Sequence, residues 1–147
     1  MFRSLPSTTV MCIGLALALP AFSQEHKIDR SQLPPAVQKT VDEQSRGATL
    51  KGLAIEVEHG KKYYEAEMEI DGHSRDLQIN PDGTLNEIEE EVAFDKLPAN
   101  IQSALTKNAA GARITKVESL TRQGKVVSYE AAIVKNGKSS EIKLNSF

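Results

Sequence analysis

Residues 63–72 read Tyr-Tyr-Glu-Ala-Glu-Met-Glu-Ile-Asp-Gly, and this stretch decides the fold. Its even-numbered positions up to Ile70 are apolar or aromatic, and they alternate with Tyr63 and three glutamates. A period of two is typical of a half-buried strand. The Asp-Gly at its end favours a two-residue hairpin turn, because both central residues of such a turn need positive φ. We therefore predict a hairpin whose second strand points Leu77 and Ile79 inward.

The same pattern returns near the C-terminus of the chain. Tyr129-Glu130-Ala131 stands 65 residues after Tyr64-Glu65-Ala66, and Asn136-Gly137 repeats the Asp-Gly turn. Further upstream the offset is 64 residues, for Leu33-Pro34 with Leu97-Pro98, Gln38 with Gln102, Gly47-Ala48 with Gly111-Ala112, and Gly60-Lys61 with Gly124-Lys125. At these offsets the core positions, the turn residues and the glycines of the two segments all match. The pattern indicates a duplication, with repeat 1 over 33–92 and repeat 2 over 93–147.

Each repeat is expected to open with a helix. Leu33, Val37 and Val41 lie four residues apart, as do the corresponding residues of repeat 2, Leu97, Ile101 and Leu105. This spacing gives one apolar stripe per helix. The predicted fold class is α+β, with two tandem repeats that each hold one helix and a three- to four-stranded antiparallel sheet, the helices being packed on one face. A fourth strand of repeat 1 is expected within 84–92.

The N-terminus has the layout of a secretory signal peptide over 1–23. A positive charge at Arg3 precedes an apolar run over 10–19, and Ala21-Phe22-Ser23 supplies small residues for cleavage. The run is shorter than the roughly 20 residues that span a bilayer, and no second one follows. We expect a periplasmic or secreted protein that has no integral membrane segment after cleavage and starts with a polar segment over 24–32.

Composition narrows the function of the exported part. Cleavage removes Cys12, the single cysteine, so stability has to come from packing rather than from disulfides. It also removes Arg3 from the 18 basic residues and none of the 20 acidic ones, which changes the net charge from −2 to about −3. Nucleic-acid binders are basic and carry clustered Lys and Arg, so no nucleic-acid partner is expected.

The order of these features resembles a known family. Each repeat contains, in order, Leu-Pro, a helix, Gly-Ala, a strand, Gly-Lys, the Tyr-Glu-Ala strand, Asp/Asn-Gly and a last strand. This order resembles the PepSY-like group, which is related in fold to the secreted β-lactamase-inhibitor proteins. The resemblance covers residues 33–147. It implies that two units form one broad, curved sheet with the helices behind it, and that the role is binding or inhibition in the envelope or outside the cell. No inhibitory contact loop is matched, and the disulfide-forming cysteines of those inhibitors are absent.

One surface carries more charge than solubility requires. If the alternation holds, repeat 1 points Tyr63 and six carboxylates outward, namely Glu56, Glu58, Glu65, Glu67, Glu69 and Asp76. Like charges on neighbouring strands repel each other, so such a face costs stability. It can also attract a basic partner, with Tyr63 as an anchor. Repeat 2 is less acidic there, with Glu130, Glu141 and Lys143. A face that serves only for solubility is the alternative.

Catalytic chemistry is not indicated by any motif. There is no Gly-x-Ser-x-Gly, and the three histidines (His26, His59 and His73) lack the paired spacing of metal ligands. We expect no enzyme and no cofactor. The leading hypothesis is a module that binds another envelope or extracellular protein through its open sheet face.

A calcium-binding or calcium-sensing protein is the alternative function. Residues 78–89 place Asn80 and Asp82 at the third and fifth positions of a calcium loop and Glu89 at the twelfth. Gln78 stands where an aspartate belongs, and the flanking residues are typical of strands rather than helices. A Pro-Asp-Gly turn explains the same residues, so these three are weak metal candidates.

Overall fold

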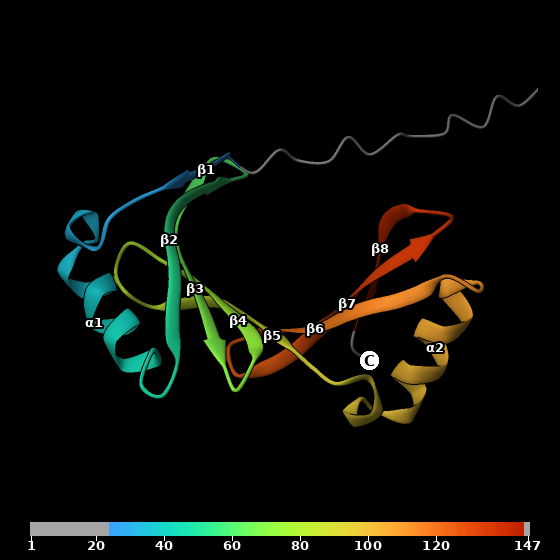
Figure 1. The fold of residues 1–147 in the computed structure, drawn as a ribbon. Helices are drawn as coiled ribbons and strands as arrows, with labels where there is room; N and C mark the ends of the chain where they lie inside the picture. Colours follow the sequence, from blue (N-terminus) through green and yellow to red (C-terminus); the bar gives the residue numbers. More distant parts are fainter. Residues whose placement is uncertain (1–23, 146–147) are drawn as a thin grey trace, which may run out of the picture.

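The computed structural model describes residues 24–145, and the predicted signal peptide over 1–23 lies outside them. The described residues form one antiparallel sheet of eight strands, which lie in the order of the chain, together with two short α-helices (Figure 1). The strands are β1 (Gln24–Lys27), β2 (Thr49–Glu58), β3 (Lys61–Ile70), β4 (His73–Ile79), β5 (Leu85–Glu91), β6 (Arg113–Arg122), β7 (Lys125–Lys135) and β8 (Lys138–Asn145). The helices are α1 (Pro35–Gln44) and α2 (Ala99–Ala109), and each follows a 3₁₀ turn, η1 (Arg30–Gln32) or η2 (Phe94–Lys96).

The predicted fold class is wrong. The described chain is mostly β and has a single sheet, not two helix-plus-sheet repeats with separate sheets. The reason lies in β5, which pairs with β4 on one side and with β6 on the other, from Ile88–Thr121 to Glu91–Glu118. A strand edge left open by one group of strands is thereby covered by the next, which satisfies its backbone hydrogen bonds. Residues 84–92 do supply the expected fourth strand of repeat 1. Its pairing with β6 joins the strands into one curved sheet, which the family resemblance implied but no residue pattern predicted.

A strand also occupies the segment that was expected to be merely polar. β1 pairs with β2 from Gln24–Val57 to Lys27–Ala54. The Ile28 amide continues the contact by donating to the Leu53 carbonyl at 2.9 Å. β1 therefore covers part of one edge of the sheet, whereas β8 forms the opposite edge.

The helices begin and end where the local sequence indicates. Pro34 and Pro98 are the residues immediately before α1 and α2, where a missing N–H costs no helical hydrogen bond. Gln102 Nε2 donates to the Leu97 carbonyl at 2.8 Å, and Gln38 makes the matching bond to Leu33. After α2 the chain turns through Ala110 and Gly111, which both have positive φ. Glycine adopts such a backbone conformation without strain, so Gly111 suits the second of these positions.

Both helices cover the same face of the sheet. Val37 and Val41 of α1 pack on Tyr64, Ala66 and other residues of β3 and β4, and Ile101 and Leu105 of α2 pack on Val117, Ala131 and their neighbours in β6 and β7. The cross-strand pairs Leu77–Ile88, Ile88–Thr121 and Val117–Ala131 place these two clusters on one side. The sheet bends between the helices, so that its other face is concave (Figure 1).

A concave acidic face as the candidate site

Carboxylates dominate the concave, helix-free face, which we call the acidic face. Alternation along each strand points Glu65 and Glu67 away from the buried Tyr64, Ala66 and Met68. The cross-strand pairs carry the same face across the sheet, from Glu56 and Glu58 in β2 to Glu130 and Lys143 in β7 and β8. Its acidic members are Glu25, Glu56, Glu58, Glu65, Glu67, Glu69, Asp76, Glu87, Glu89, Glu91, Glu118, Glu130 and Glu141.

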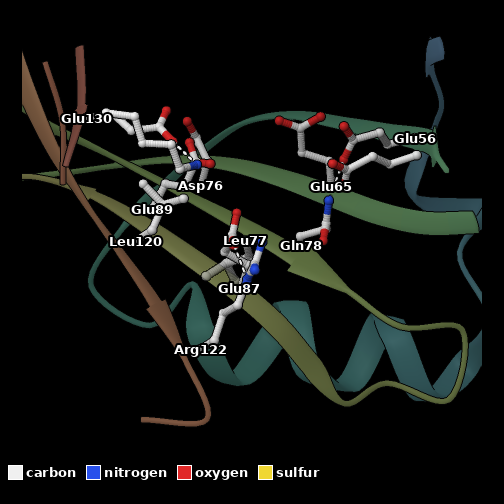
Figure 2. Close-up of a pocket in the computed structure, with 12 residues that line it drawn as sticks. Glu56, Glu65, Asp76, Leu77, Gln78, Glu87, Glu89, Leu120, Arg122 and Glu130 are labelled. Atoms are coloured by element: carbon white, nitrogen blue, oxygen red, sulfur yellow. Dashed lines mark hydrogen bonds and ion pairs between the residues drawn. The ribbon is translucent and has the colours of Figure 1, made fainter. Parts of the chain in front are cut away.

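All seven predicted partner-binding residues lie on the acidic face. Tyr63 is directly opposite Glu56, Glu67 is opposite Asp76, and Glu69 is opposite Ser74. Four of the seven, Glu56, Glu58, Glu65 and Asp76, also line a hollow of about 360 Å³ in this face (Figure 2). The hollow continues over Gln78, Glu87 and Glu89 to Leu120, Arg122, Glu130 and Lys143. Tyr63, Glu67 and Glu69 lie outside its lining.

Four carboxylates on this face pair with a lysine or arginine, and the first is Glu69, with an oxygen 3.3 Å from the Lys51 ammonium. Glu87, which is only 8% exposed, is paired with the Arg122 guanidinium. Lys143 is paired with Glu130, and that hydrogen bond is the main cause that raises the pKa of the Lys143 ammonium. The Lys116 ammonium lies 2.5 Å from a Glu118 oxygen. Apart from Glu69 with Lys51, these pairs involve strands β5 to β8.

Glu65 and Glu89 differ, because neither has an ion-pair partner within residues 24–145. Burial, together with the negative charges of Glu25 and Glu56, raises the pKa of Glu65 to about 7. Burial likewise contributes most to raising the pKa of Glu89 to about 8, and the charges of Glu87 and Glu118 are the next largest causes. Both groups resist ionisation because burial and neighbouring carboxylates disfavour their charged form, and neither group has an ion-pair partner of its own among the described residues.

The strongest concentration of charge is where β4, β5 and β6 meet. One oxygen each of Asp76, Glu89 and Glu118 lies within 4.8 Å of the other two. Burial also raises the pKa of Asp76, although the nearby Lys116 acts in the opposite direction. Figure 2 shows Asp76 and Glu89 side by side at one end of the hollow, with Glu56 and Glu65 at the other. We call Asp76, Glu89 and Glu118 the carboxylate triad.

The weak calcium candidates do not form one group. Asp82 accepts hydrogen bonds from the Thr84 amide at 2.9 Å and hydroxyl at 2.7 Å, and these bonds lower its pKa. Asn80 Nδ2 donates to the same hydroxyl at 3.0 Å, and the Gly83 amide donates to the Asn80 carbonyl, so both residues belong to a tight turn. Glu89 belongs to the carboxylate triad instead.

Several residues of the hollow were not among the predicted site residues, Glu87, Leu120 and Arg122 among them. The alternation of their strands is visible in the sequence, but only the pairing of β5 with β6 brings Leu120 and Arg122 beside residues of repeat 1. Ser128 was also missed. It is 2% exposed, and its hydroxyl has no hydrogen-bond partner among the described residues.

Comparison with known proteins supports the fold. No protein family matches the sequence, and no curated protein is similar to it. Among solved structures, a DUF2874 family protein from Bacteroides ovatus is 17% identical, with a TM-score of 0.59, over 77% of this chain and 80% of that one. A candidate periplasmic protein from Bacteroides eggerthii is 16% identical, with a TM-score of 0.62, over 77% and 81%. A BLIP-like protein from Bacteroides fragilis is 17% identical, with a TM-score of 0.56, over 77% and 79%.

These identities establish a shared fold and nothing finer. The PepSY-like resemblance of the sequence is not among the relationships that they show, whereas a BLIP-like fold is supported in part. Among the helices of the described residues, none has the length and apolar character needed to cross a membrane.

Proposed function

We propose that this chain is an exported, non-enzymatic module that binds a basic region of another envelope or extracellular protein on its acidic face. The observation that carries the proposal is that Glu65 and Glu89 have no ion-pair partner among the described residues, on a concave surface rich in like charges. A basic partner would offset this repulsion and stabilise the ionised carboxylates. Fold likeness to a candidate periplasmic protein and to a BLIP-like protein supports an envelope location and a role in holding or inhibiting an enzyme.

Affinity capture with matched variants tests this function. The purified protein is immobilised and exposed to an envelope extract from its own cells, and the retained proteins are identified by mass spectrometry. An acidic-face variant carries Tyr63→Ala with Glu65, Glu67 and Glu69 changed to Gln. A matched control changes Glu43, Asp42 and Asp95 to their amides, since these groups lie on α1 and η2, away from the acidic face.

The proposal predicts a partner that the native and control columns retain, that the acidic-face variant loses, and that moderate salt elutes, because exposed charges are screened. Equal retention on all three columns would contradict it. It would place the binding surface elsewhere on the protein.

A divalent cation is a second candidate ligand, because the carboxylate triad offers three oxygens at short separation. Ca²⁺ binds six to eight oxygens, so water or the partner would complete the shell. A ligand that binds only the folded state raises the melting temperature. This candidate predicts a rise in Tm with 2 mM CaCl₂ relative to EDTA, and its loss in Glu118→Gln. Identical melting curves in CaCl₂ and EDTA would dismiss it.

A further inference from the structure

The last strand of the sheet, β8, has an outer edge, on the side away from β7, with which no strand pairs among residues 24–145. We propose that this edge binds the β8 edge of a second copy of the chain, so that two molecules form one continuous antiparallel sheet about a two-fold axis at Ile142. The inference goes beyond the proposed function, because it does not depend on what the acidic face binds. It rests on a contrast between the two repeats, on the regularity of the edge and on the order of its charges.

The equivalent strand of repeat 1 shows what a neighbouring strand contributes. β4 lies between β3 and β5, and its residues Leu77 and Ile79 are 0% exposed. Their counterparts 65 residues later, Ile142 and Leu144, pack against the hydrophobic cluster of α2 but are only half-buried. A second β8 would place another Ile142 opposite the first, as Ile88 of β5 lies opposite Leu77. It would thereby cover apolar surface that repeat 1 covers with its own strand.

The outer edge of β8 is regular. Its pairing with β7 continues from Lys138 to Asn145 without a bulge, and the strand contains no proline. Bulges, prolines and covering segments keep an edge from pairing with another chain. The opposite edge of the sheet has two of these features, because β1 covers part of β2 and the β2–β3 pairing shifts register between Leu50 and Gly52. The β8 edge therefore accepts a further strand more readily.

The hairpin before β8 determines which backbone groups this edge offers. Asn136 and Gly137 both have positive φ, so the turn has two residues, and the flanking Lys135 and Lys138 form a hydrogen-bonded pair. Hydrogen-bonded and non-hydrogen-bonded pairs alternate along antiparallel strands. The residues whose N–H and C=O groups point away from β7 are therefore Ser139, Glu141, Lys143 and Asn145.

The charges on these outward-directed residues favour one register. With the two-fold axis at Ile142, Glu141 of each copy lies opposite Lys143 of the other. Ser139 then lies opposite Asn145, and the four resulting pairs form about eight backbone hydrogen bonds, two for each pair. Centring the pairing on Glu141 or on Lys143 instead would place like charges directly opposite each other, which is destabilising. The edge is therefore complementary to itself in the register centred on Ile142.

Glu141 can accept the second copy's lysine because it has no ion-pair partner among the described residues. Burial raises the pKa of Glu141, and the charge of Glu130 adds to this effect. Lys143 of the same copy is paired with Glu130, but an ammonium has three donors and can bind a second carboxylate as well. A lysine on an edge strand normally discourages pairing. Here the opposing glutamate offsets it.

Charge reversal in two separate variants tests the inference. Sedimentation equilibrium of the purified protein, from micromolar to near-millimolar concentration, is expected to show a reversible equilibrium between monomer and dimer. Glu141→Lys and Lys143→Glu each place like charges opposite each other at two positions, so each variant alone should dimerise about tenfold more weakly or less. An equimolar mixture of the two variants again brings lysines opposite glutamates. It should associate about as strongly as the native protein.

A matched control and a backbone measurement distinguish this edge from a general charge effect. Glu43→Lys makes the same change in net charge on α1, which packs on β3 and β4, so it should alter the dissociation constant of the dimer less than twofold. Amide hydrogen exchange of the native protein is compared at low and high concentration. The amides of Glu141 and Lys143 should exchange about fivefold more slowly at high concentration, whereas those of Ser140 and Ile142, which already bond to β7, should change little.

Three results would overturn the inference. The first is a monomer at every concentration, which would leave the edge to another extended partner. The second is a dimer that neither Glu141→Lys nor Lys143→Glu weakens, which would place the interface elsewhere. The third is a mixture of the two variants that does not associate although circular dichroism shows both to be folded. Each of these results can occur while affinity capture on the acidic face succeeds, so the proposed function is tested separately.

Discussion

The two ends of the acidic face differ in whether their carboxylates have a cationic partner in the same chain. Toward β6, β7 and β8, Glu87, Glu118 and Glu130 each have a cationic side chain of the same chain. Toward β3, β4 and β5, Glu65 and Glu89 have none among the described residues, and their pKa values are raised to about 7 and 8. The acidic face therefore offsets its charge internally toward β8, whereas its other end, the open end, pairs Glu69 with Lys51 but leaves Glu65 and Glu89 without an ion-pair partner. An external cation would therefore stabilise ionised carboxylates most at the open end.

The largest expected effect comes from breaking an internal pair. Arg122→Ala leaves the buried Glu87 without its guanidinium, and losing a charge-assisted hydrogen bond of this kind costs about 2 kcal/mol of unfolding free energy. For a chain of this size that is a fall in Tm of about 8 °C, measured by thermal denaturation at pH 7. In a Glu87→Gln background the same substitution should cost less than half as much. Equal losses in both backgrounds would mean that Arg122 acts through packing alone.

Removing a carboxylate that has no ion-pair partner should raise the stability of the protein. Glu89→Gln eliminates repulsion from Glu87 and Glu118, and relief of like-charge contacts across strands is worth about 1 kcal/mol. At pH 8.5 we expect Tm to rise by about 4 °C. At pH 5 the difference should vanish, because the native Glu89 is then protonated. A variant that is less stable than the native protein at pH 8.5 would contradict this account of the open end.

The sign of this pH dependence follows from the raised pKa values. Between the unfolded value of about 4.5 and the folded value of about 8, the folded protein holds a proton at Glu89 that the unfolded chain releases. The contribution of this group to stability is therefore complete below about pH 4.5 and is lost as the pH rises toward 8. Glu65 follows the same course toward its value of about 7. Chemical denaturation of the native protein and of the double variant Glu65→Gln/Glu89→Gln, at pH 5 and 8.5, measures the difference.

The smallest effect is expected at the exposed pair of Lys143 and Glu130. Lys143 is 55% exposed, and exposed ion pairs contribute about 0.5 kcal/mol. Lys143→Met should lower Tm by no more than about 2 °C. A loss as large as that of Arg122→Ala would show that the two ion pairs differ less in strength than their exposure indicates.

Local patterns in the sequence predicted the individual hairpins, and non-local pairing decided the rest. Asp71-Gly72 and Asn136-Gly137 form their turns with positive φ at both positions, and alternation placed Glu65, Glu67 and Asp76 on one face correctly. The union of all strands into one sheet depends on hydrogen bonds between Glu91 and Glu118 and their neighbours, which no local period encodes. The strand Gln24–Lys27 was missed for the same reason, since four polar and charged residues become a strand only by pairing with β2.

The candidate site shows the same division. The partner-binding candidates of repeat 1 could be placed from alternation alone, whereas the carboxylate triad could not. It combines Asp76, Glu89 and Glu118 from three strands, and it exists because β5 lies between β4 and β6. Ser128 gave no signal in the sequence, because a serine in a strand is more often solvated than buried.

The central claim is that the open end of the acidic face holds carboxylates that lack a cation, and their titration tests it most directly. The side-chain carboxyl carbons of Glu65 and Glu89 are followed by ¹³C NMR from pH 4 to pH 10, with Glu65→Gln and Glu89→Gln to assign the signals and Glu69 as an exposed reference. The account predicts midpoints near 7 and 8, and a fall of both when a basic peptide, N-acetylated and C-amidated trilysine, is added. Midpoints close to 4.5 for both groups, unchanged by the peptide, would contradict it.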